Sequence, residues 1–203
     1  RVAIDENTQS MIKLVLPAVL RMWEDEDDKM VVTQLCTELR LIMKDVGPAT
    51  TIEYADSISK HLLEIFEKKA PCQTIDFEDD EDMPDEDEMA ELDSLLICAA
   101  ADCVAEFASA FGDAFEPIMD TFLPHIAGYA VSRPRPLPSV AVSERAMAVG
   151  CLAEIAKNMG PGITKYAEQS QLSTEKHHDS IFLARQHTRA QMAVEAEESC
   201  LLF

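Results

Sequence analysis

The densest group of chemically active side chains is a run of carboxylates at residues 76–88. Ten of its thirteen residues are Asp or Glu, and none is Lys or Arg. Such a run cannot bury apolar surface and repels itself, so it predicts a solvated loop over about residues 72–90. Two roles fit: a loop that only keeps the protein soluble, or a surface that attracts a basic partner. The residues expected to face such a partner are Asp79, Asp80, Glu81, Asp82, Asp85, Glu86, Asp87 and Glu88.

Other reactive side chains form weaker patterns. His177, His178 and Asp179 are metal-ligand types, but adjacent histidines in a polar stretch are more often incidental. The acidic run lacks the glycine and the ligand spacing of an EF-hand calcium loop. Residues 200–203 (CLLF) fit a prenylation signal on Cys200, with a chance ending as the alternative. The glutamates before Cys200 have the wrong charge to support membrane attachment.

No enzyme motif accompanies these residues. The sequence contains no glycine-rich phosphate loop, no HExxH and no GxSxG motif, and its carboxylates form no defined pair. We therefore expect no catalysis, no cofactor and no metal site. The cysteines form no CxxC pair, and most lie in apolar stretches, which indicates buried, reduced thiols of an intracellular protein. They are Cys36, Cys72, Cys98, Cys103, Cys151 and Cys200.

The charge balance limits the class of partner. The 203 residues include 38 Asp and Glu against 17 Lys and Arg, a formal net charge of -21. Direct nucleic-acid binding is not expected, because that affinity comes from Lys and Arg at the phosphates. An anionic membrane surface is disfavoured for the same reason, and no apolar run is long enough to insert. A basic protein fits best. The chain starts at Arg1 within a helical pattern, so we expect it to be a fragment.

Amphipathic helices must position the acidic run. Apolar residues at helical spacing predict helices over about 8–24, 29–46, 50–69, 86–111, 114–131 and 139–159. Pro17 should kink the first helix or mark its true start, and Thr50 with Glu53 resembles a capping box for the third. Three prolines predict an extended loop over 133–138. The pattern fails after about residue 169, so residues 170–203 are expected to form a divergent tail, poorly packed or weakly helical.

An internal repeat organises these helices. Gly47, Gly112 and Gly160 each follow a similar apolar pattern and precede a new helix, at separations of 65 and 48 residues. Removing an insertion of roughly 18 residues around the acidic run makes the two separations similar, within the range of helical-hairpin repeats. Residues 1–169 are therefore expected to form an all-α solenoid of antiparallel helical hairpins, of the HEAT or armadillo kind. The acidic run is then inserted between the two helices of one hairpin.

Several segments resemble HEAT repeats of the importin-β (karyopherin-β) family, most like its importin-4 branch. The resemblance covers about residues 8–169 and rests on residues 95–104 (LLICAAADCV), 111–117 (FGDAFEP), 122–124 (FLP) and 143–156 (SERAMAVGCLAEIA). It implies a receptor that binds cargo in the cytoplasm and releases it on Ran-GTP in the nucleus. Cargoes of this branch are basic, including histones and ribosomal proteins. The Ran site is expected outside this segment, so no Ran-binding residue is assigned.

The resemblance also bears on the tail after residue 169 and on the alternative function. The family would continue into further repeats after residue 169, so the tail indicates a truncated, mis-spliced or divergent end. A HEAT-repeat scaffold without a transport role is the alternative function, and its acidic loop would only solubilise it. Release of a basic partner by Ran-GTP would separate the two functions.

Overall fold

The computed structural model describes residues 6–48, 51–74, 85–130, 138–164 and 166. Every element in these ranges is an α-helix or a short 3-10 helix, so the predicted all-α class is confirmed. The α-helices are α1 (Glu6–Trp23), α2 (Lys29–Val46), α3 (Ala55–Phe66), α4 (Glu86–Phe111), α5 (Glu116–Ala130) and α6 (Pro138–Met159). The 3-10 helices are η2 (Ile52–Tyr54), η3 (Pro71–Gln73), η4 (Gly112–Phe115) and η5 (Gly160–Ile163).

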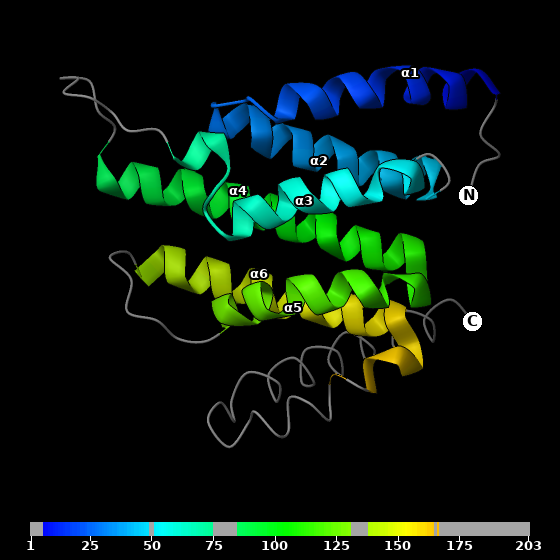
Figure 1. Ribbon diagram of the computed structural model, residues 1–203. Helices are drawn as coiled ribbons and strands as arrows, with labels where there is room; N and C mark the ends of the chain where they lie inside the picture. Colours follow the sequence, from blue (N-terminus) through cyan, green and yellow to red (C-terminus); the bar gives the residue numbers. More distant parts are fainter. Residues whose placement is uncertain (1–5, 49–50, 75–84, 131–137, 165, 167–203) are drawn as a thin grey trace, which may run out of the picture.

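The helices form antiparallel hairpins stacked in two layers (Figure 1). In one layer α4 packs between α2 and α6, and in the other α3 packs between α1 and α5. We call these the even and the odd layer. Within each layer the helices run in the same direction, because each is separated from the next by one helix that runs back (Figure 1). This arrangement is the predicted α-solenoid.

Glycines end the helices of the even layer. Gly47, Gly112 and Gly160 have φ of 93°, 54° and 53°, values that L side chains rarely adopt. The N–H of Gly47 donates to the carbonyl of Met43 at 3.0 Å, and the N–H of Gly112 donates to the carbonyl of Ala108. The glycines aligned from the sequence therefore occupy equivalent places, at the end of the second helix of each hairpin.

Buried contacts between neighbouring helices of each layer hold the hairpins together. Trp23 on α1 stacks on His61 of α3 with ring centroids 5.0 Å apart, and Phe66 of α3 meets the edge of Phe122 on α5 at 5.9 Å. The Cys151 thiol of α6 donates to the Ala101 carbonyl of α4 at 3.3 Å. The largest fully buried side chains are Phe107, Phe115, Phe122, Met43, Ile58, Leu62, Ile65, Leu96, Ile97, Met119, Ile126 and Ile155.

Some predicted boundaries were wrong. α1 begins at Glu6 and continues through Pro17, so the proline does not mark the start of the helix; Leu16, Leu20 and Trp23 on both sides of it are buried. η2, flanked by Thr51 without a side-chain cap, precedes α3, so α3 begins at Ala55 and not at residue 50; Thr50 of the predicted capping box lies outside the described residues. α3 ends at Phe66, not near residue 69.

Other predicted segments lie outside the described residues. These are most of the proline-rich loop at 133–138 and the tail at 170–203, including His177, His178, Asp179 and Cys200.

Candidate interface for a basic partner

The start of α4 gathers four of the carboxylates predicted to face a basic partner. Asp85 is the N-cap: its Oδ1 accepts hydrogen bonds from the backbone N–H groups of Asp87 and, at 3.3 Å, of Glu88. Glu86, Asp87 and Glu88 form the first turn, and all four side chains are exposed. Negative charge is favourable at a helix N-terminus. These residues therefore stabilise the helix start and also present negative charge to solvent.

The eight predicted residues fall into two groups. Asp79, Asp80, Glu81 and Asp82 lie outside the described residues, whereas the structure brings Asp85, Glu86, Asp87 and Glu88 together. Residues 86–90, at the end of the expected loop, belong to α4, because an aspartate N-cap followed by acidic residues suits a helix start. At the other end of that loop, η3 buries Cys72.

Two acidic residues farther along α4 add to this surface. Glu91 and Asp102 are exposed and follow Glu88 by three and fourteen residues, so all three share one face of the helix. The sequence analysis missed Glu91 and Asp102, although their helical spacing from Glu88 was a usable signal. We call the exposed carboxylates Asp85, Glu86, Asp87, Glu88, Glu91 and Asp102 the acidic segment of α4.

Ion pairs fix the acidic segment on the solenoid. Asp93 of α4 places Oδ1 2.8 Å from Nζ of Lys29, the first residue of α2, and Oδ2 3.6 Å from Nζ of Lys68, which follows α3. The Lys29 side chain is only 10% exposed and that of Asp93 23%, so this pair is more shielded from solvent than a surface salt bridge. Asp93 thus joins three separate elements beside the two ends of the insertion.

Lys68 also closes α3 in an unusual backbone conformation. Its φ is 58°, and among the described residues it is the non-glycine with positive φ. The N–H of Lys68 donates to the Ile65 carbonyl at 3.1 Å, and that of Lys69 donates to the Glu64 carbonyl at 2.8 Å. This pair of bonds is the Schellman motif, whose left-handed position is usually glycine. Lysine adds a side chain that reaches Asp93.

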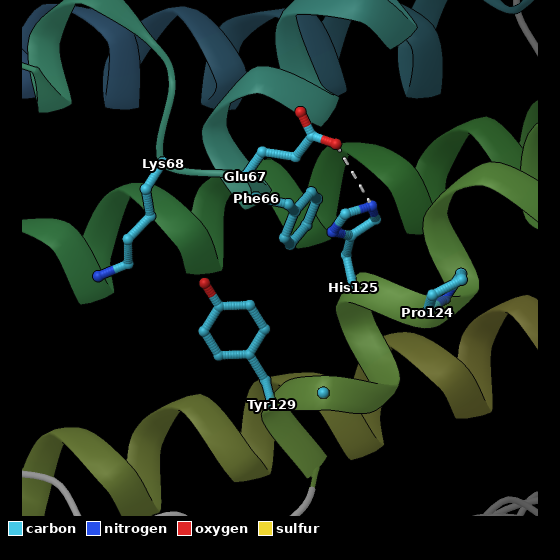
Figure 2. Close-up of a pocket in the computed structure, with 7 residues that line it drawn as sticks. Phe66, Glu67, Lys68, Pro124, His125 and Tyr129 are labelled. Carbon is cyan, nitrogen blue, oxygen red and sulfur yellow. Dashed lines mark ion pairs between the residues drawn. The ribbon is translucent and has the colours of Figure 1, made fainter.

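A pocket of about 290 Å³ opens between the end of α3 and α5 (Figure 2). Across it, Glu67 Oε1 lies 3.8 Å from Nε2 of His125. Lys69 Nζ donates to Glu67 Oε2 at 2.7 Å, and this hydrogen bond is the main reason that the pKa of Glu67 is lowered. Because the carboxylate of Glu67 is already paired with Lys69 and His125, we assign no reaction to this pocket. The lining residues are Phe66, Glu67, Lys68, Pro124, His125, Gly128 and Tyr129.

The described cysteines are poor nucleophiles. Burial raises the pKa of Cys72 to about 11 and raises the pKa values of Cys36, Cys103 and Cys151 further. Cys98 is half-buried, and burial also raises its pKa, partly opposed by hydrogen bonds with Ser143 and Ser94. The thiolate is the reactive form of cysteine, so these thiols are unreactive at neutral pH. All five are free, as the sequence predicted.

The described residues form no metal site, and their one long apolar segment is part of the core. Among the described residues, no three His, Cys, Asp or Glu side chains gather as ligands for a metal ion. The segment Glu86–Ala130 is long and apolar enough to span a membrane by composition. It is, however, divided at Gly112 into α4 and α5, and α4 is buried between α2 and α6. Its apolar composition is that of a core helix.

Comparison with known proteins gives one informative similarity. No protein-family model matches the chain. The chain is 28% identical over 172 residues to the probable importin subunit beta-4 of Schizosaccharomyces pombe. The matched part is 82% of this chain but only 16% of that protein. Together with the all-α solenoid, this similarity supports membership of the importin-β family and a HEAT-like fold.

Proposed function

We propose that this chain is a cargo-binding part of a nuclear import receptor that moves between cytoplasm and nucleus. The similarity to an importin subunit supports a transport role, and the match spans only 16% of that protein. The cargo we propose is a basic protein of the histone or ribosomal type. Ran would act on the whole receptor through repeats elsewhere.

The observation that carries the cargo proposal is the acidic segment of α4. Asp85, Glu86, Asp87 and Glu88 stand together at an exposed helix start, directly after the acidic insertion. A dense negative field of this kind accelerates encounter with a basic chain and is screened by salt. The proposed mechanism is electrostatic capture first, followed by contacts with the helices.

The test removes four charges without removing the helix cap. The variant carries Asp85→Ser, Glu86→Gln, Asp87→Asn and Glu88→Gln, because serine also caps a helix N-terminus. Its affinity for a lysine-rich histone-tail peptide is measured by fluorescence anisotropy from low to high salt. Each exposed pair contributes about 0.2–1 kcal/mol, so the loss over four charges should be about 1–4 kcal/mol at low salt. The salt dependence should become shallower.

A control variant removes three carboxylates elsewhere. Glu53→Gln, Asp56→Asn and Asp113→Asn change exposed acidic residues beside the start of α3 and just after the end of α4. This variant should keep most of the affinity, because its charges lie far from α4's start. Unchanged affinity and salt slope in the four-site variant would contradict the proposal. That outcome would favour the alternative, a HEAT-repeat scaffold whose carboxylates only solubilise it.

A further inference from the structure

Each helix of the even layer exposes large apolar surface in its first half, and on α2 Val31 (37% exposed) adds to Met30. Met30 on α2 is 52% exposed, Leu95 on α4 is 53% exposed, and Val142 on α6 is 63% exposed. Single exposed apolar residues are normal on proteins. These three differ because they occupy related places in consecutive hairpins. We call them the apolar row.

Contacts between the helices align the row. Lys29, which precedes Met30, pairs with Asp93, two residues before Leu95. One turn after Leu95, Cys98 is hydrogen bonded to Ser143, the neighbour of Val142. The repeat gives the same register, because Met30 and Leu95 each stand 17 residues before the glycine that ends their helix. In α6 that position is Ser143, directly beside Val142. The row therefore crosses the layer instead of following one helix.

Acidic residues flank the row on its exposed side. Leu95 lies four residues after Glu91 and seven before Asp102, so these side chains share the solvent face of α4. Asp27 and Asp28 are exposed just before α2. Among the described residues around Met30 and Leu95, apolar and acidic side chains thus alternate. A complementary partner presents apolar side chains to the row and basic side chains to its flanks.

The distance between neighbouring helices indicates the backbone conformation of the bound segment and the spacing of its apolar side chains. Neighbouring packed helices lie about 8–10 Å apart. An extended or polyproline II chain advances about 3.1–3.4 Å per residue, so side chains three residues apart are separated by about 9–10 Å. We propose that the apolar row binds an extended basic segment with an apolar side chain at every third position. This inference rests on the proposed binding of a basic protein and adds the sequence pattern that is recognised.

The test compares two nine-residue peptides of equal composition. One has leucine at positions 2, 5 and 8 and lysine elsewhere, and its isomer has leucine at positions 2, 3 and 4. Both are too short to form stable helices in water. The spaced peptide should bind the full chain about tenfold more tightly, because only it reaches all three helices. Affinities are measured by fluorescence anisotropy at two salt concentrations.

Variants test whether the preference for the spaced peptide depends on the apolar row. Met30→Gln with Leu95→Gln should abolish the tenfold preference but leave the salt-dependent binding. Met11→Gln with Leu14→Gln removes two exposed apolar residues of α1, outside the even layer, and should leave the preference intact. Equal binding of the isomers, or a preference that survives the Met30 and Leu95 changes, overturns this inference alone. Failure of both peptides to bind overturns the proposed function as well.

Discussion

Replacing Lys68 by glycine or alanine tests the closure of α3. A left-handed backbone costs an L residue about 1–2 kcal/mol, which only glycine avoids. Glycine lowers the free energy of unfolding by about 0.4–1 kcal/mol, because it gives the unfolded chain more conformational freedom. Both substitutions remove the half-exposed Lys68–Asp93 pair, which contributes about 0.2–1 kcal/mol. These contributions nearly cancel for Lys68→Gly, which should remain within about 1 kcal/mol of the wild type, and Lys68→Ala should be the less stable variant.

Urea unfolding followed by circular dichroism measures this order. Ala146→Gly serves as the control, because Ala146 is exposed in the middle of α6, where glycine should cost about 1 kcal/mol. Glycine is thus predicted to be better than alanine at residue 68 and worse at residue 146. The left-handed assignment of Lys68 would be refuted if Lys68→Gly unfolded at a lower urea concentration than Lys68→Ala.

Three further predictions concern other parts of the fold. In the native protein at pH 8, Cys98 should react with a thiol reagent faster than Cys36, because burial shields the Cys36 thiol and raises its pKa so that it stays protonated. Equal reaction rates in the native protein would contradict the burial of Cys36. Phe122→Ala should lower the free energy of unfolding by about 3–5 kcal/mol, measured in urea, because the ring is fully buried and packs on Phe66 of α3. Asp93→Asn should be more destabilising than Glu154→Gln, because Asp93 pairs with a nearly buried lysine and Glu154 with an exposed one; thermal unfolding compares them, and equal shifts in Tm would count against the three-element ion pair.

The sequence predicts helices best where their ends carry local signals. The bounds of α2 and α4 agree with the prediction, because Asp28 and Asp85 cap their starts and Gly47 and Gly112 end them. The start of α3 was missed because the chain forms η2 first. The apolar spacing over residues 8–24 predicted a helix on both sides of Pro17, and the structure keeps that helix continuous.

The candidate site was predictable only in part. Four predicted carboxylates at the start of α4 are grouped in the structure, because neighbours in sequence remain neighbours in a helix. The contacts of Asp93 with Lys29 and Lys68 were not foreseen, since they depend on the register between helices distant in sequence. The repeat spacing was enough to predict that Met30 and Leu95 occupy equivalent positions. That both side chains are exposed could be seen only in the packed structure.

The anchoring of both ends of the acidic insertion has an evolutionary consequence. Burial of Cys72 fixes the chain before it, and the bonds of Asp85 and Asp93 fix the chain after it. These anchors depend on contacts of Cys72, Asp85 and Asp93 themselves. Changes in the length or charge of the sequence between the anchors therefore leave those contacts in place, and selection can alter that sequence while the hairpins beside it stay unchanged.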